Sequence, residues 1–225
     1  MLVQIEGVLN PEQVARCRSV LEGLDWVDGR ATAGTQSAQA KRNLQVPQDA
    51  PEARDLGEMI LGALGQHQTF ISAGLPLRVF PPLFNRYDVG MAFDTHIDNA
   101  IRFAGPVRYR TDLSATLFLS DPADYEGGEL IIEDSYGEHA VKLAAGDAIL
   151  YPASSLHRVA PITRGSRWAA FFWAQSMIRS DERRALLYDM DLAIQSLTPS
   201  VGQSAEPLVS LAGIYHNLIR MWADV

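Results

Sequence analysis

Short segments of β-rich composition, each closed by a turn signal, dominate the chain between residues 77 and 175. They are Leu77 to Tyr87, Leu113 to Leu119, Glu129 to Glu133, Ala140 to Leu143, Ala148 to Tyr151 and Trp168 to Ala174. Pairs such as Asp121-Pro122, Gly127-Gly128 and Gly146-Asp147 separate them, at the intervals typical of an antiparallel sandwich or barrel. We therefore predict a jelly-roll core, that is, a double-stranded β-helix.

Two amphipathic helices are predicted ahead of this core. A strand over residues 2–9 leads to Asn10, which forms a capping pair with Gln13 at the start of the first helix. Residues 29–51 show no sustained hydrophobic periodicity, so we predict a loop with one strand around Asn43 to Val46. From Glu52 to Ala73 apolar residues recur at helical spacing, which predicts a second helix.

Helical spacing returns after Ser180, a suitable N-cap, and a loop around Pro199 to Pro207 divides this C-terminal segment. We predict a mainly β protein with flanking helices (α+β). Residues 1–178 form one domain with its core at about 77–175, and residues 179–225 form a helical extension. The apolar stripe over 208–222 either packs on the body or forms a homodimer interface.

Composition limits the partners and the compartment. The formal net charge is -8 and no run of Lys or Arg occurs, so we expect no nucleic-acid partner. No stretch of 18 apolar residues and no leader pattern over Met1 to Leu9 are present, so we expect a soluble, cytoplasmic protein without a membrane partner. Cys17 is the only cysteine, which excludes an internal disulfide and fits a reducing compartment.

His96 and Asp98 are two residues apart, so on an extended strand their side chains leave from the same face. His157 lies in a later β segment, and a sandwich brings such residues together at one mouth. Two imidazoles and one carboxylate form the facial triad that suits iron(II). A His-x-Asp pair alone is common by chance, so the hypothesis depends on its occurrence together with His157 and Arg167.

Arg167 opens an apolar run, and a guanidinium that points inward there requires an anionic partner such as a dicarboxylate. The alternative is an arginine at a solvated rim. Two histidines and one carboxylate also occur in zinc hydrolases, but the sequence has no His-Glu-x-x-His helix. Arg167 therefore favours an oxygenase over a zinc hydrolase.

Several motifs occur in a fixed order between Phe84 and Trp173. They are Asn85-Arg86-Tyr87-Asp88-Val89-Gly90, Thr95-His96-Ile97-Asp98, Tyr125-Glu126-Gly127-Gly128-Glu129-Leu130, Ala145-Gly146-Asp147-Ala148, Leu156-His157-Arg158-Val159 and Gly165-Ser166-Arg167-Trp168. Together they resemble the prolyl-4-hydroxylase-like branch of the 2-oxoglutarate oxygenases. With Asn99-Ala100, Lys41-Arg42-Asn43 and the helical tail, nearly the whole chain resembles the bacterial PKHD-type hydroxylases, a family sometimes linked to iron uptake.

This resemblance implies an iron(II)- and 2-oxoglutarate-dependent dioxygenase that hydroxylates a C–H bond of a peptidyl or small-molecule substrate and releases succinate and CO2. It implies that His96, Asp98 and His157 hold the iron, that Arg167 pairs with the far carboxylate of 2-oxoglutarate, and that oxygen takes the remaining position. Ascorbate is an expected reductant. Tyr87 matches the family tyrosine and either hydrogen-bonds the co-substrate or packs in the core. Because related halogenases replace the carboxylate that Asp98 retains, hydroxylation is favoured over halogenation.

Three residues are candidates for substrate contact, although none identifies the substrate. Asn99 directly follows the triad and Asn43 belongs to the Lys41-Arg42-Asn43 motif, but both also suit turns. Arg102, with Arg108 and Arg110, forms either a cationic lip for an anionic substrate or a solvated loop.

The alternative to an enzyme is a non-enzymatic β-barrel iron binder or sensor that uses the same three ligands. Such a protein has no need of Arg167. The remaining histidines are expected to be hydrogen-bonded core or boundary residues rather than ligands; they are His67, His139 and His216.

Overall fold

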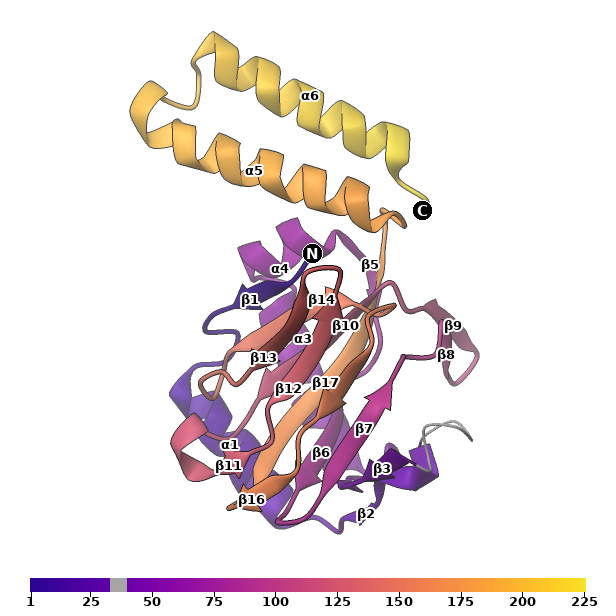
Figure 1. The fold of residues 1–225 in the computed structure, drawn as a ribbon. Helices are drawn as coiled ribbons and strands as arrows, with labels where there is room; N and C mark the ends of the chain where they lie inside the picture. Colours follow the sequence, from indigo (N-terminus) through magenta and orange to yellow (C-terminus); the bar gives the residue numbers. More distant parts are fainter. Residues whose placement is uncertain (33–39) are drawn as a thin grey trace.

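Two facing antiparallel β-sheets form the body of the protein, which confirms the predicted jelly roll (Figure 1). The computed structural model describes residues 1–32 and 40–225. The larger sheet has the strand order β1-β14-β10-β17-β6-β4-β2, with β5 also paired to β17. Its strands are β1 (Val3–Ile5), β2 (Val27–Asp28), β4 (Leu44–Gln45), β5 (Pro76–Val79), β6 (Leu83–Tyr87), β10 (Leu113–Phe118), β14 (Ala148–Pro152) and β17 (Arg167–Ser176).

The smaller sheet has the strand order β13-β12-β15-β7-β3. Its strands are β3 (Lys41–Arg42), β7 (Ala92–His96), β12 (Leu130–Asp134), β13 (Gly137–Val141) and β15 (His157–Val159). Two short pairs lie beside the sheets: β8 (Ile101–Ala104) with β9 (Val107–Arg110), and β11 (Glu126–Gly127) with β16 (Ile162–Arg164).

Successive side chains of the central strands point to opposite faces of the larger sheet, and this divides the core into two layers. On β17, Trp168, Ala170 and Phe172 pack in the cluster that also contains helix residues, whereas Arg167 and Trp173 face the cavity between the sheets. Strand β10 follows the same rule, because its odd-numbered residues face the helices and its even-numbered ones the opposite sheet. The inner faces of the two sheets can therefore supply a site, while the outer face of the larger sheet packs on helices to form the main core.

Helices cover the outer face of the larger sheet. They are α1 (Pro11–Glu22), α3 (Pro51–Leu64) and α4 (Gln68–Gly74), with the 3-10 turns η1 (Gly29–Thr32) and η2 (Pro122–Asp124) in connecting segments. The predicted capping pair of Asn10 and Gln13 is present at α1. The prediction of one helix from Glu52 to Ala73 was wrong, because α3 stops at the Gly65 C-cap and α4 starts after His67.

Two other predicted segments differ in the structure. The predicted strand from Leu77 to Tyr87 is two strands, because Pro81 and Pro82 lack the backbone N–H that a continuous ladder requires. The segment after Asp98 that carries Arg102 is a β-hairpin, β8–β9, rather than an unstructured solvated loop. Arg102 of this hairpin borders the cavity described below.

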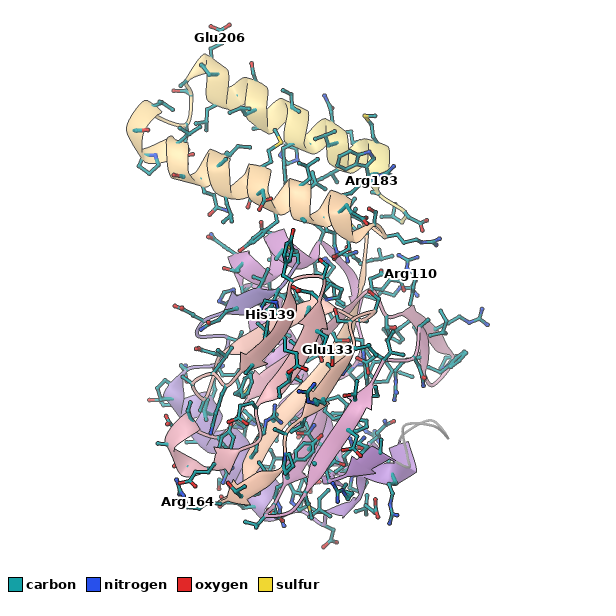
Figure 2. The ribbon with its side chains drawn as sticks, in the orientation of Figure 1. Arg110, Glu133, His139, Arg164, Arg183 and Glu206 are labelled. Carbon is teal, nitrogen blue, oxygen red and sulfur yellow. The ribbon has the colours of Figure 1, made fainter. Side chains whose placement is uncertain are left out.

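The C-terminal segment forms two antiparallel helices, α5 (Asp181–Val201) and α6 (Glu206–Trp222), which stand at one end of the β body (Figure 1). Ser180 caps α5 as predicted, but the helix continues through Pro199, so the linking loop is shorter than predicted. Leu187 is buried with Leu75 and Ile178 at the junction with the body. In Figure 2, Arg183 lies beside α6, where its guanidinium carbon is 5.2 Å from the Trp222 ring centre.

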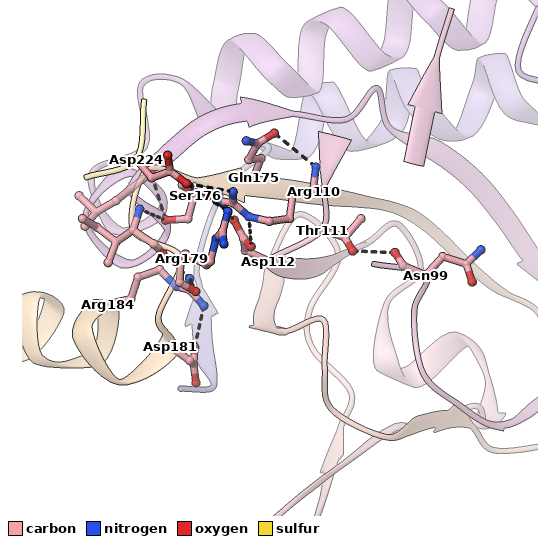
Figure 3. Close-up of polar contacts among 12 residues, drawn as sticks. Asn99, Arg110, Thr111, Asp112, Gln175, Ser176, Arg179, Asp181, Arg184 and Asp224 are labelled. Carbon is pink, nitrogen blue, oxygen red and sulfur yellow. Dashed lines mark hydrogen bonds and ion pairs between the residues drawn. The ribbon is translucent and has the colours of Figure 1, made fainter. Parts of the chain in front are cut away.

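A polar network joins β17 to the helical pair (Figure 3). Arg110 donates to both carboxylate oxygens of Asp112, and Asp112 accepts the backbone N–H of Ser176 at 2.8 Å. The buried Arg184 donates to the Ile178 carbonyl at 2.6 Å and to Asp181 at 2.8 Å. These bonds hold the start of α5 against the end of the strand that carries Arg167.

Cys17 lies on the buried face of α1 with 0% of its surface exposed. Burial raises the pKa of its thiol to about 11, so the sulfur is protonated at neutral pH. Among the described residues, no helix combines the length and the apolar character that crossing a bilayer requires.

Candidate metal centre and adjoining cavity

His96, Asp98 and His157 lie together at the inner face of the smaller sheet. Strands β7 and β15 pair in a register that sets His96 opposite His157, and their ring centres are 4.2 Å apart. His157 Nε2 is 3.7 Å from Asp98 Oδ2, and the three residues offer ligand atoms that all lie within 4.8 Å of one another. Within the described ranges, this is the group of His, Cys, Asp and Glu side chains close enough to share a metal ion.

Hydrogen bonds orient each of the three side chains. His96 Nδ1 lies 2.9 Å from the Asp94 carbonyl oxygen, and His157 Nδ1 lies 3.0 Å from that of Ser155. Because a carbonyl oxygen only accepts, both Nδ1 atoms carry the proton, and both Nε2 atoms present a lone pair. Ser114 donates to Asp98 Oδ2 at 2.6 Å, which fixes the carboxylate beside the imidazoles.

The protonation state of His96 also suits metal binding. Burial, and then the neighbouring His157, lower the pKa of His96 to about 4. Its imidazole is therefore neutral at neutral pH, which is the form that binds a metal ion. Phe93 stacks on the His96 ring with 3.6 Å between ring centres and limits its movement.

Arg167, at the start of β17, is 1% exposed and points into the same cavity. Its Nε and Nη1 atoms are buried without a hydrogen-bond partner among the described residues. Leaving a buried guanidinium unsatisfied is costly, so this geometry indicates a place for an anion. The carboxylate of a bound dicarboxylic acid has the charge and the shape that the guanidinium requires.

Tyr87 lies opposite Arg167 in the register of β6 and β17. The Arg167 guanidinium carbon is 5.6 Å from the centre of the Tyr87 ring and 5.1 Å from that of Phe118. Burial raises the pKa of Tyr87 to about 12, so its hydroxyl stays protonated and can donate a hydrogen bond. The side chain both packs in the core between the sheets and borders the cavity.

The substrate candidates lie in different places. Asn99 and Arg102 border the cavity that contains the triad. The Asn99 carbonyl accepts a hydrogen bond from Thr111 at 2.6 Å (Figure 3). Asn43 is buried against the backbone of Gly29 and does not belong to the cavity lining.

Several cavity residues were not singled out from the sequence. Ser114 and Thr116 line the cavity from β10, and their alternation with apolar residues is the signal that could have found them. Lys41 also borders the cavity, although it is buried, and burial lowers the pKa of its ammonium group to about 8. The sequence marks Lys41 only as part of the Lys41-Arg42-Asn43 motif, which does not indicate that its ammonium group is buried at the cavity.

The other histidines lie outside this site. His67 precedes α4 instead of lying within a helix as predicted, and its Nε2 is 3.0 Å from the Glu6 carbonyl oxygen. His139 pairs with Asp134 at 2.8 Å on the opposite rim of the smaller sheet. His216 is exposed on α6 beside Tyr215, so the prediction of a core or boundary position was wrong for this residue.

Comparison with known families gives two matches along the chain. Residues 82–175 match the 2OG-Fe(II) oxygenase superfamily, and residues 181–224 match the PKHD-type hydroxylase C-terminal domain. A PKHD-type hydroxylase of Methylobacterium nodulans is 57% identical, and one of Beijerinckia indica subsp. indica is 59% identical. Both alignments cover 100% of this chain and 100% of the relative.

Solved structures share the fold at low sequence identity. A prolyl hydroxylase of Trichoplax adhaerens, in complex with a hypoxia inducible factor peptide fragment, has a TM-score of 0.56 at 14% identity, over 83% of this chain and 86% of its own. HygX of Streptomyces hygroscopicus, with nickel, 2-oxoglutarate and hygromycin B bound, has a TM-score of 0.53 at 17% identity, over 79% and 84%. At these identities the likeness establishes the fold alone.

Proposed function

The chain belongs to the PKHD-type hydroxylase family of 2-oxoglutarate-dependent dioxygenases, and from this premise we propose that His96, Asp98 and His157 hold its iron(II) and that Arg167 holds its co-substrate. The reaction is the hydroxylation of a C–H bond in a peptidyl or small-molecule substrate, with release of succinate and CO2. The observation that carries the assignment is the buried, unsatisfied guanidinium of Arg167 beside three converging ligand atoms.

The three residues suit iron(II) both in their donor atoms and in the way hydrogen bonds orient those atoms. Two imidazole nitrogens and one carboxylate oxygen are the donor set that suits iron(II) in oxygenases. The bonds from the two Nδ1 atoms to backbone carbonyls and from Ser114 to Asp98 orient the donors before any metal arrives. When bound, iron(II) supplies the redox chemistry that activates oxygen as 2-oxoglutarate is oxidatively decarboxylated.

The chain's own contribution is to bind, orient and exclude water. Arg167 fixes the far carboxylate of 2-oxoglutarate through charge-assisted hydrogen bonds, and Tyr87 donates to the co-substrate from the neighbouring strand. Phe93, Phe171 and Trp173 line the cavity and keep it apolar around the reacting centre. A non-enzymatic iron binder would use the same three ligands but would leave the burial of Arg167 unexplained.

Succinate release tests the assignment. Purified protein supplied with iron(II), ascorbate, oxygen and 2-oxoglutarate is expected to release succinate, slowly without a hydroxylated substrate. His96→Ala and Asp98→Ala are expected to abolish the release and to lower iron(II) affinity measured by calorimetry. His139→Ala, which removes an exposed histidine paired with Asp134, is the matched control. It is expected to keep both succinate release and iron(II) affinity. Unchanged succinate release in either ligand variant would refute the ligand assignment.

Other assignments follow from the same proposal. We place an oxygenase domain over residues 1–178 and a helical extension over 179–225, in line with the start of α5 at Asp181. Ascorbate keeps the iron reduced, and a cytoplasmic location is consistent with a single, buried cysteine. The substrate is a peptide or small molecule, and we assign neither nucleic acid nor a membrane as a partner, because the net charge is -8.

A second copy of the chain is the proposed protein partner. Exposed apolar side chains recur on one side of α5 at Leu186, Leu197 and Val201, and on α6 at Ile214 and Met221. The spacings of four, seven and eleven residues place each set on one side of its helix. Two such helix pairs, related by a twofold axis, would cover these side chains in a four-helix arrangement.

A further inference from the structure

Arg102 lies on β8, four residues after Asp98, and borders the cavity that contains the triad. Its guanidinium carbon is 4.2 Å from the centre of the Trp173 ring and 5.4 Å from that of Phe80. These contacts hold the planar group against an aromatic wall, which leaves the edge of the guanidinium, with its N–H donors, available to a ligand.

Arg102 has no acidic hydrogen-bond partner among the described residues, although its side chain is partly buried. Arg110 is paired with Asp112, and Arg86 is paired with Asp88 at 2.8 Å. The Arg102 guanidinium makes no hydrogen bond and no ion pair within the ranges 1–32 and 40–225. Asp98 is near enough for its charge to act on Arg102, but that carboxylate is bonded to Ser114 and committed to the proposed metal centre.

The charges of the loaded centre leave Arg102 uncompensated. The two charges of iron(II) and the charge of Arg167 balance Asp98 and the two carboxylates of 2-oxoglutarate. Arg102 then adds a positive charge to the cavity. A half-buried cation interacts more strongly with an anion than an exposed one does, because solvent screens it less.

We propose that Arg102 selects a substrate that carries a carboxylate, which its guanidinium binds while Trp173 supports the adjoining part of the molecule. The inference rests on the proposed function and deepens it by naming a substrate class. The hydroxylated carbon then lies within a few bonds of the carboxylate, because Arg102 and the triad border the same cavity. Arg167 serves the co-substrate, and Arg102 serves the substrate.

Equilibrium binding tests the proposal with matched probes. The probes are N-acetyl derivatives of the common amino acids and the corresponding N-acetyl amino acid amides, which share their shape but lack the negative charge. Calorimetric titrations use the iron(II)-loaded protein without oxygen and with saturating 2-oxoglutarate, so that the acids cannot occupy the Arg167 site. The best acids are expected to bind about 10-fold more tightly than their amides, a difference of roughly 1.4 kcal/mol.

Two variants connect the preference to one side chain. Arg102→Gln is expected to remove the preference for acids, and Arg102→Lys to keep part of it. Arg108→Gln is the matched control, because Arg108 belongs to the same hairpin but is exposed beside Phe103. Circular dichroism and thermal melting establish that each variant is folded. Equal binding of acids and amides by the unsubstituted protein, absence of acid binding, or an unchanged preference in Arg102→Gln overturns the proposal.

Succinate release from the same preparations separates this inference from the proposed function. Release of succinate without any acid preference overturns the substrate class and leaves the oxygenase assignment intact. An acid preference that depends on Arg102, in protein that never releases succinate, overturns the oxygenase assignment and leaves the carboxylate site.

Discussion

Arg167 is almost completely buried, and two of its nitrogens have no partner among the described residues. Its effect on the stability of the fold and its effect on co-substrate binding can therefore be measured separately. Arg167→Met keeps an unbranched apolar stem and removes the guanidinium with its charge. We expect the KM for 2-oxoglutarate to rise roughly 10- to 100-fold, because a charge-assisted bond to the far carboxylate is lost. In urea unfolding of the metal-free protein, the same variant should be as stable as the original or more stable, by up to about 4 kcal/mol.

Arg164→Met is the matched control for this substitution. Arg164 lies at the end of β16, three residues before Arg167 and at the end of the body away from α5 and α6 (Figure 2), where it pairs with Glu126 in an exposed position. It should change neither the KM nor the stability by a measurable amount. Marked destabilisation of metal-free Arg167→Met would show that the fold itself satisfies the guanidinium.

At the level of single residues, the sequence predicts the placement of a side chain where spacing along a strand alone fixes the direction in which it points. His96 and Asp98 are two residues apart, and the structure brings them to the same place as His157. Ser114 and Lys41 are different, because their roles depend on which strands face each other. The role of Arg102 could not be predicted for the same reason, because the Trp173 ring that its guanidinium contacts is 71 residues away in the chain.

Among the elements, the turn between β11 and β12 is the one most closely coupled to the co-substrate site. Gly128 has a φ of +69°, and a Cβ there would lie 2.3 Å from Ile162 Cδ1 and 3.2 Å from Arg167 Cδ. Gly128→Ala therefore combines backbone strain with displacement of the Arg167 stem. We expect a loss of about 1–3 kcal/mol in urea unfolding and a higher KM for 2-oxoglutarate.

Gly7→Ala is the control that separates the effect of backbone strain from the effect of displacing Arg167. Gly7 has a similar φ of +65°, but nothing lies within 4 Å of the position that a Cβ would take. This variant should lose stability by about 1 kcal/mol and keep the KM for 2-oxoglutarate. If Gly128→Ala also keeps that KM, the turn does not position Arg167.

The sequence predicts elements well where local chemistry decides, and poorly where tertiary contacts do. The capping pair of Asn10 and Gln13 fixes the start of α1 without help from the rest of the fold. The β8–β9 hairpin does alternate apolar and charged residues around Gly105-Pro106, and this local signal was overlooked. Its place on the body, however, depends on Tyr109 packing on Phe80. The break at Gly65 was missed because apolar residues continue at helical spacing beyond it.

For the whole molecule, the proposed dimer gives a test of how the helical pair is used. Light scattering on a sizing column is expected to give twice the mass of the chain at micromolar concentrations. Leu197 and Met221 are 43% and 74% exposed, and the double variant Leu197→Gln with Met221→Gln should give the single mass. The variant should keep succinate release, because the cavity lining lies between residues 41 and 173.

Tyr136→Gln provides the comparison for the dimer test. Tyr136 is also a large exposed side chain, but it lies at the β12–β13 turn rather than on the helical pair. Its substitution should leave the mass unchanged. A single mass for the unsubstituted chain, or a double mass in the α5–α6 variant, would contradict dimerisation through these helices.

The global fold was predictable because turn signals between residues 77 and 175 recur at the spacing of an antiparallel sandwich. The pairing of strands was not, since β17 lies between β10 and β6, which come from distant parts of the chain. Docking of α5 on the body depends on Leu187 meeting Leu75 and Ile178, a contact that no local pattern specifies.

The seclusion of Cys17 has a practical consequence for following the β8–β9 hairpin. The native thiol is fully buried and protonated at neutral pH, so maleimide reagents should leave it unmodified in the folded protein. A cysteine introduced at Phe103, which is 62% exposed and next to Arg102 in the chain, would then be the one reactive site for a fluorophore that follows this hairpin.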